Sequence, residues 1–401
     1  MSLTAKQEKL MKRDFRNFAH AVWMHLELPP LTPVQNSICQ YVQHGGNRTQ
    51  ILAYRGVGKS YITAAYVCWL LWQDKEKKIM IVSAGRDRSD AFAIFVRNLI
   101  RDVPFLKHME PDKSVGERAT QNIFDINGVK PSGSPSVKSV GVTGQMTGSR
   151  ADIIIADDIE VVANSTTHDL REKLIRLVTE FDAIIKPEGK ILYLGTPQTE
   201  LSLYNNLYTK GYDMKIWCSR VPTEKEAANY GAKLSPFIRE MMKTQEAGTS
   251  TDPLRFDDED LARRELSYGR SGFALQFQLD TSLSDSDKFP LKIDDLIITN
   301  LHDKLPEEVY WSNSPLHVLK DVPNVAMAGQ KFYIPEKVSD ERGSPQMSIL
   351  SIDPSGKGKD QTAYTVLQML NGNIFIRKQG GFQGGYTDET LSGLANIAKA
   401  Y

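Results

Sequence analysis

Runs of apolar residues separated by turns divide the first half of the chain into alternating helices and strands. From Phe15, apolar residues at helical spacing predict an amphipathic helix that ends before Pro29-Pro30. Strands are predicted over 49–54, 78–83, 152–156 and 190–194, and a helix that is apolar almost all round over 61–72. Apolar strands that alternate with helices indicate a parallel sheet covered on both faces, so we predict an α/β fold.

The pattern changes farther along the chain. Residues 221–282 are helical and polar in pattern, and residues 283–345, which are rich in Pro, Asp and Ser, are predicted to be connecting structure. Strands are then predicted over 347–353, 362–370 and 373–377, followed by a helix over 387–401. We therefore predict three parts: a core over 1–220, a helical and connecting part over 221–345, and the start of another domain over 346–401.

Composition narrows the class of protein. Of the 401 residues, 41% are hydrophobic and 24% charged, as in soluble globular proteins, and this length suits two to three domains. No apolar run reaches the ~20 residues that cross a bilayer, so no membrane partner is expected. The 3 cysteines match no zinc or disulfide spacing, which predicts a reducing, cytosolic setting. A net charge of zero argues against a protein that coats nucleic acid, though not against one that grips it locally.

The segment Gly56-Val57-Gly58-Lys59-Ser60 lies between a predicted strand and a predicted helix, the setting of a phosphate-binding loop. Its backbone N–H groups could curl around phosphates, Lys59 would reach the β- and γ-phosphates, and Ser60 would ligate Mg²⁺. The full pattern has glycine where Ala53 stands, so the loop is a variant, and a Gly-Lys-Ser turn without function is the alternative. We predict a P-loop NTPase with a RecA/ASCE-like sheet that binds and hydrolyses ATP.

A second motif ends the apolar strand at 152–156 with the acids Asp157, Asp158 and Glu160. Asp157 is predicted to contact Mg²⁺, and Asp158 or Glu160 to activate the attacking water. Acids that merely cap a solvated strand end are the alternative. Arg55 in the loop and Arg150 before the strand could supply the positive charge that phosphoryl transfer needs, or could form structural ion pairs.

Together these segments resemble the large terminase subunit of tailed double-stranded DNA phages, especially of the short-tailed podovirus type. The residues that carry the resemblance lie at 54–60, 147–158, 193–197 and 351–360. The resemblance implies an ATPase motor that translocates double-stranded DNA into the procapsid, and a C-terminal RNase H-like endonuclease that cuts concatemeric DNA.

The resemblance also implies roles for single residues. Arg55 would sense the γ-phosphate within its own subunit, and Gln35 would read the adenine. The segment Gly195-Thr196-Pro197 matches the coupling motif that links hydrolysis to movement. Arg150 would act as an arginine finger in the site of a neighbouring subunit, since these motors work as homo-oligomeric rings, usually pentamers. The family commonly has Glu at the position of Asp158, so the general base could be Asp158 or Glu160.

Partners and location follow from the same resemblance. The implied partners are double-stranded DNA, the portal protein of the procapsid and the small terminase subunit. The implied location is the host cell cytoplasm, with transient binding to the procapsid and absence from the mature virion.

The third part is similar to the start of the family's nuclease. Asp353 closes an apolar strand before a Gly- and Lys-rich turn, as the first acid of a two-metal Mg²⁺ or Mn²⁺ site does. The family draws its next acids from elements that would follow Tyr401. We therefore expect a truncated domain with an incomplete nuclease site.

Two other functions fit part of the pattern. One is a helicase-like, nucleic-acid-dependent ATPase, although helicases usually carry a second RecA-like lobe where this chain has a helical segment. The other is a portal-docking module that binds nucleotide without hydrolysing it, which the set of Lys59, Ser60 and Asp157 argues against.

Overall fold

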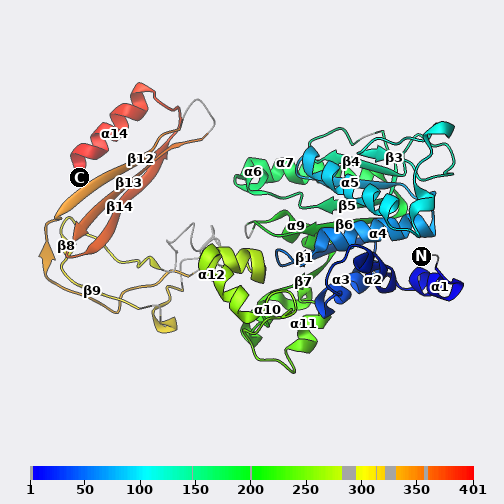
Figure 1. The fold of residues 1–401 in the computed structure, drawn as a ribbon. Coiled ribbons are helices and arrows are strands. Elements are labelled where there is room, and N and C mark those ends of the chain that lie inside the picture. The colour runs from blue at the N-terminus through cyan, green and yellow to red at the C-terminus, as the bar shows by residue number, and fades with distance from the viewer. Residues whose placement is uncertain are drawn as a thin grey trace. The chain divides into compact units, whose positions relative to one another are not determined.

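The computed structural model of this chain describes residues 3–146, 148–198, 201–281, 295–312, 314–320, 331–355 and 360–401. The chain forms two compact units, residues 1–288 and 289–401, and each is described by itself (Figure 1). Residues 289–345 were predicted to be connecting structure. In the structure they belong to the same compact unit as the C-terminal strands. The predicted division into three functional parts stays a prediction.

A seven-stranded sheet forms the centre of the first unit, in the order β3-β4-β2-β5-β6-β1-β7. The strands are β1 (Arg48–Ala53), β2 (Ile79–Ser83), β3 (Ile123–Phe124), β4 (Val137–Gly141), β5 (Ala151–Asp157), β6 (Ile185–Gly195) and β7 (Asp213–Trp217). Neighbouring strands run parallel, except that β3 is antiparallel to β4. The parallel α/β fold is therefore confirmed, and β1, β2, β5 and β6 are the four strands predicted for this part.

The first unit also contains helices, some of which pack against the sheet. They are α1 (Ala5–Arg13), α2 (Phe15–His25), α3 (Pro33–His44), α4 (Lys59–Gln73), α5 (Arg86–Asp102), α6 (Val162–Ser165), α7 (His168–Thr179), α8 (Phe181–Ile184), α9 (Leu203–Thr209), α10 (Glu224–Tyr230), α11 (Pro236–Met241) and α12 (Asp258–Phe273). Helix α4 is buried along most of its length, and α2, α3 and α5 pack against it. Because α4 has packed neighbours on several sides, apolar residues occur all round it (Figure 1). The helix predicted from Phe15 is α2.

The carboxyl ends of the parallel strands lie level at one edge of the sheet. Ser83 of β2 pairs with Asp157 of β5, and Asp157 pairs with Leu194 of β6. On the other side of β6, Leu52 of β1 pairs with Gly195. Strand β6 therefore lies between the strand before the glycine loop and the strand that ends in Asp157, and it places both motifs at the same edge.

The buried carboxylate of Asp252 joins the helical part that follows β7 to the loop after β1. Asp252 accepts hydrogen bonds from the hydroxyl of Tyr54, at 2.7 Å, and from the hydroxyl of Thr32, at 2.9 Å. Burial raises the pKa of Asp252, against these two hydrogen bonds. This contact joins the N-terminus of α3, the end of β1 and the segment before α12, so residues far apart in sequence meet beside the loop.

In the second unit, β12 (Met347–Asp353), β13 (Thr362–Leu370) and β14 (Asn373–Phe382) form an antiparallel sheet in that order. Helix α14 (Asp388–Ala400) packs on one face, where Leu394 and Ile397 contact Tyr364 and Val366. Two short strand pairs precede this sheet, β8 (Leu305–Pro306) with β11 (Arg342–Gly343) and β9 (Val309–Tyr310) with β10 (Lys337–Val338). The three strands and the final helix predicted for this part are confirmed.

Candidate active site

The loop from Tyr54 to Ser60 connects β1 to α4. Gly56 and Gly58 have φ values of +90° and +94°, in the left-handed region that glycine adopts without strain. A Cβ atom at Gly56 would lie 2.9 Å from the ring of Phe256, so a side chain has no room there. Helix α4 begins directly after Gly58, and its first N–H groups have no partner within the helix. A curled backbone at a helix N-terminus is suited to bind an anion.

Three side chains of the two motifs meet at the loop. The Lys59 ammonium donates to the carbonyl of Ala53, which folds the side chain back along the loop. The hydroxyl of Ser60 lies 3.5 Å from each carboxylate oxygen of Asp157. Burial, together with the charge of Asp158, raises the pKa of Asp157 to about 7. A hydroxyl beside a half-buried carboxylate fits the oxygen ligands that Mg²⁺ prefers, and a bound cation would offset the cost of partly desolvating the carboxylate charge.

A cavity of about 610 Å³ opens beside the loop. Four cationic side chains line it, Arg55, Lys59, Arg88 and Arg255. In the part of the chain that the structure describes, no three His, Cys, Asp or Glu side chains are grouped as a complete metal site. Mg²⁺ at phosphate sites is commonly held by the phosphates and one or two protein oxygens. The size and charge of the cavity fit a nucleoside triphosphate with its metal.

Both candidate bases, Asp158 and Glu160, line the cavity, but they differ in exposure and in hydrogen-bond partners. Asp158 lines the cavity, and its carboxylate lies 3.9 Å from the guanidinium of Arg88. Its φ of +45° is unusual for a residue other than glycine and typical of functional positions. Glu160 is only 2% exposed, and its carboxylate accepts three hydrogen bonds from residues before and at the start of α9.

These donors are the backbone N–H of Gln198, at 2.9 Å, the hydroxyl of Ser202, at 2.9 Å, and the backbone N–H of Leu203, at 2.5 Å. These three bonds hold the Glu160 carboxylate in place, while burial raises its pKa against them. The geometry therefore favours Asp158 as the base and gives Glu160 a positioning role.

Arg55 lines the cavity, as predicted. Two further arginines, Arg88 and Arg255, also line it, and the sequence analysis did not identify them. The backbone N–H of Arg55 donates to the carbonyl of Gln276, at 3.0 Å. Arg88 lies in the first turn of α5, directly after β2, and the side chain of Arg255 donates to the carbonyl of Gly56, at 2.5 Å. The place of Arg88 could have been inferred, since β2 ends at the same edge as β5. No local signal marks Arg255, which lies about two hundred residues after the loop.

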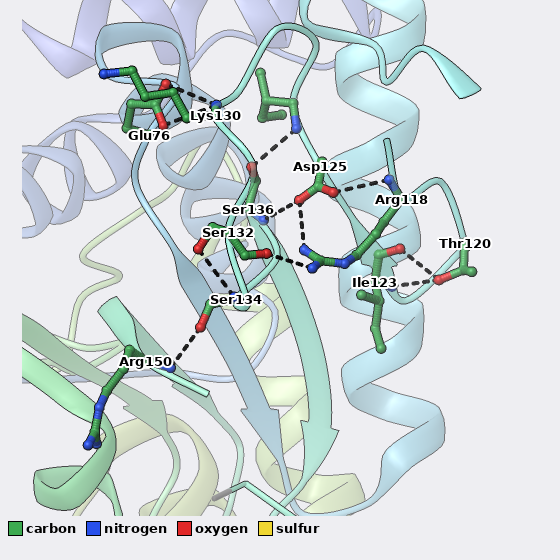
Figure 2. A network of polar contacts seen from close by, with 11 residues as sticks. Glu76, Arg118, Thr120, Ile123, Asp125, Lys130, Ser132, Ser134, Ser136 and Arg150 are labelled. Atoms are coloured by element: carbon green, nitrogen blue, oxygen red, sulfur yellow. Dashed lines mark hydrogen bonds and ion pairs between the residues drawn. The ribbon is translucent and has the colours of Figure 1, made fainter. Parts of the chain in front are cut away.

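Arg150 lies at the opposite edge of the sheet, directly before β5. Figure 2 shows its backbone N–H donating to the hydroxyl of Ser134, at 2.9 Å, next to a network in which Asp125 holds Arg118 and Ser136. Its guanidinium donates to the carbonyl of Ala183. The seven residues of β5 separate Arg150 from Asp157 by about 20 Å. Arg150 therefore lies outside the cavity of its own chain.

The side-chain amide of Gln35 holds the loop through a hydrogen bond at each end. Its Oε1 accepts the backbone N–H of Thr32, at 3.0 Å, and its Nε2 donates to the carbonyl of Val57, at 2.8 Å. Both amide atoms thus brace the loop against the start of α3. The role of reading adenine stays a prediction.

The segment Gly195-Thr196-Pro197 continues β6 between the two motifs. Thr196 lines the cavity, and a Cβ atom at Gly195 would lie 2.0 Å from the hydroxyl of the buried Tyr204. The segment is joined to the end of β5 because Gln198, the next residue, donates to Glu160. Glu160 therefore links the acidic motif to the expected coupling motif.

Comparison with known proteins identifies relatives of this chain. It is 45% identical over 400 residues to the "Terminase, large subunit" of Enterobacteria phage T3, an alignment that covers 98% of this chain and 68% of the relative. This chain belongs to the large terminase family. Among solved structures, it is similar to the large terminase ATPase domain of Thermus phage P74-26, with a TM-score of 0.37 and 13% identity, over 65% of this chain and 96% of that chain.

The C-terminal part of this large terminase matches a known domain family. Residues 352–401 match the family described as "Terminase Bacteriophage T7, Ribonuclease H-like domain". Asp353 lies within this match, exposed at the end of β12 and paired across the sheet with Ala363. The Gly- and Lys-rich turn at 356–359 lies outside the described residues. No helix in the described part of the chain is long and apolar enough to span a membrane.

Proposed function

We propose that this large terminase is an Mg²⁺-dependent ATPase that translocates double-stranded DNA into the procapsid. The observation that carries the proposal is that Lys59, Ser60 and Asp158 line one cationic cavity, with Asp157 beside the hydroxyl of Ser60. Membership of the large terminase family supports the same function. The expected partners are the portal protein, the small terminase subunit and further copies of this chain in a ring, within the host cell cytoplasm.

The roles of the residues follow from their placement. ATP supplies the phosphoanhydride bond, and Mg²⁺ offsets phosphate charge. Lys59 and the loop N–H groups hold the phosphates, while Ser60 and Asp157 offer oxygens to the metal. Asp158 orients the attacking water and takes its proton. Arg55 and Arg88 supply positive charge where negative charge redistributes in the transition state.

Arg150 can take part in hydrolysis only in the site of a neighbouring subunit. Since it lies about 20 Å along β5 from Asp157, it would act on the nucleotide of a neighbouring copy. Coupling would run through Glu160, which joins the acidic motif to Gly195-Thr196-Pro197 by way of Gln198. A change at the phosphates could thereby move α9 and the end of β6.

The test is steady-state phosphate release from ATP, measured with Mg²⁺ over a range of protein concentrations. We expect turnover that disappears in excess EDTA, and a rate per chain that rises with concentration, because Arg150 would act between copies. A rate per chain that does not change with concentration would leave the ATPase standing and contradict the role of Arg150. Bound ATP without turnover at any concentration would instead favour a portal-docking module.

For the RNase H-like part we propose that endonuclease activity needs further carboxylates grouped with Asp353. Two-metal cleavage requires several carboxylates that converge on ions ~4 Å apart. In the described part of the unit, Asp353 is not grouped with other acids as a metal site. The 401-residue chain is therefore expected to leave supercoiled plasmid uncut in Mn²⁺, measured by gel electrophoresis over hours. Cutting that Asp353→Ala abolishes and Asp388→Ala preserves would overturn this proposal.

A further inference from the structure

Arg150 is anchored at its backbone, while the residue itself lies exposed at the surface. Its backbone N–H donates to the hydroxyl of Ser134, at 2.9 Å. The hydroxyl of Ser149, the residue before it, accepts from the ammonium of Lys138, at 3.0 Å. Both anchors come from one segment of the chain, the loop before β4 and the start of β4 itself. This segment therefore sets where Arg150 leaves the sheet.

We propose that Arg118 is a positioning residue for Arg150. Held by the buried carboxylate of Asp125, Arg118 fixes the loop that anchors Arg150, and so fixes where the guanidinium of Arg150 meets the nucleotide of a neighbouring chain. The inference rests on the proposed function, since it needs Arg150 to act between subunits. It adds to that function residues that act only through Arg150.

Asp125 is the fixed point of this arrangement. It is 7% exposed, and its carboxylate accepts the backbone N–H of Ser136, at 3.1 Å. The same carboxylate accepts the backbone N–H of Arg118, at 3.0 Å, and the guanidinium of Arg118, at 3.3 Å (Figure 2). A carboxylate that is buried in this way needs a charged partner and hydrogen bonds to remain ionised without a large cost. Asp125 therefore holds the guanidinium of Arg118 next to the start of β4.

Arg118 connects this fixed point to the loop before β4. Its Nη2 donates to the carbonyl of Ser132, at 2.7 Å. The hydroxyl of Ser132 accepts the backbone N–H of Ser134, at 3.3 Å, and the hydroxyl of Ser134 accepts that of Arg150 (Figure 2). The loop forms neither helix nor strand and contains Gly133, the least restricted of residues. Side-chain hydrogen bonds rather than a backbone ladder therefore hold it in place.

The placement of Arg150 matters because of what a guanidinium does in phosphoryl transfer. It has to face the phosphate oxygens as negative charge redistributes among them. A displacement of about 1 Å, caused by a change far from the chemistry, is enough to lower a rate about 10²-fold. Arg150 lies about 20 Å along β5 from Asp157. Loosening the loop should thus impair the site of a neighbour and leave the cavity of its own chain intact.

The first experiment measures phosphate release at saturating ATP and Mg²⁺, at a protein concentration where the rate per chain has reached its maximum. Arg118→Gln, which removes both guanidinium bonds, and Ser134→Ala, which removes one hydroxyl, should each lower kcat about 10- to 100-fold. Binding of a non-hydrolysable ATP analogue should not change. Ser134→Thr, which keeps the hydroxyl, should keep the wild-type rate.

Arg101→Gln is the matched control, because it changes an exposed arginine in the last turn of α5 and should keep the wild-type rate. Ser134→Ala leaves the ion pair of Arg118 with Asp125 in place, so it tests the same link without unbalancing the buried carboxylate. A wild-type kcat in both Arg118→Gln and Ser134→Ala would overturn the inference.

Mixing two variants separates positioning from folding. Chains with Lys59→Ala lose their own phosphate site but keep Arg150 in place, whereas chains with Arg118→Gln keep their phosphate site and lose the placement of Arg150. An equal mixture should therefore hydrolyse ATP several-fold faster than the mean of the two variants measured separately at the same total concentration. A role of Arg118 in folding alone would give no such gain.

The reference is an equal mixture of Arg150→Ala with Lys59→Ala chains, which should show the same gain. A gain in the reference mixture without one in the Arg118→Gln mixture would overturn the positioning role and leave the action of Arg150 between subunits standing. If neither mixture gains activity, the action of Arg150 between subunits is wrong, and the positioning role of Arg118 is wrong with it.

Discussion

Replacing Lys59 by alanine is expected to lower the rate of ATP hydrolysis at least about 100-fold, the scale of losing one preorganised charge in a phosphoryl-transfer site. Burial lowers the pKa of Lys59, against the negative charges of Asp158 and Asp157, which raise it. Without it, the loop would lose the cation that balances these acids as well as the expected phosphate contact. The measurement is steady-state phosphate release at saturating ATP and Mg²⁺.

A matched control is available on the same unit. Lys225→Ala removes a positive charge from the exposed surface of α10 and should hydrolyse ATP at the wild-type rate. Circular dichroism of both variants would check that the sheet is intact. A Lys59→Ala variant that is folded and still hydrolyses ATP at more than about a tenth of the wild-type rate would show that turnover does not depend on this loop.

Residues that form contiguous motifs could be placed from the sequence. Lys59 and Ser60 follow an apolar strand and begin a helix, and Asp157 ends a second apolar strand. Because the carboxyl ends of parallel strands meet at one edge of a sheet, these patterns suffice to predict that Ser60 and Asp157 come together. The distance of 3.5 Å from the hydroxyl of Ser60 to the carboxylate of Asp157 agrees with that prediction.

Contacts between segments far apart in the sequence could not be predicted from local patterns. Arg255 and Asp252 meet the loop only because the chain returns after β7, and no pattern near these residues indicates that return. Strand β3 has two residues, too few for a periodicity, and α1 is too polar to show an apolar stripe that distinguishes it from a solvated segment. Tertiary contacts rather than local preference decide these elements.

The choice between Asp158 and Glu160 shows the same limit. Both are acids within three residues of Asp157, and spacing alone treats them alike. The partners that decide the choice, Ser202 and Leu203, come from the start of α9, about forty residues farther along. Only the folded chain shows that Glu160 serves as a hydrogen-bond acceptor for that segment.

Asp158→Asn is therefore expected to affect mainly the rate of hydrolysis, and Glu160→Gln mainly the free energy of unfolding. Asp158→Asn should lower kcat by about 10²- to 10⁴-fold, the usual contribution of a general base, with ATP affinity nearly unchanged. Glu160→Gln should lower the free energy of unfolding by about 2 kcal/mol or more, because an amide cannot accept all three hydrogen bonds and leaves a buried donor unpaired. Single-turnover hydrolysis per folded chain and denaturant unfolding measure the two effects.

Glu172→Gln is the matched control, since it neutralises an exposed acid on α7 and should change neither quantity. If Asp158 is the base and Glu160 a positioning residue, Asp158→Asn should be as stable as the wild type. Glu160→Gln should then keep most of the wild-type kcat per folded chain at low temperature. The reverse result, with Glu160→Gln stable and inactive and Asp158→Asn active, would make Glu160 the base. It would also mean that hydrolysis requires α9 to release this carboxylate, which would place the movement of α9 before the chemical step rather than after it.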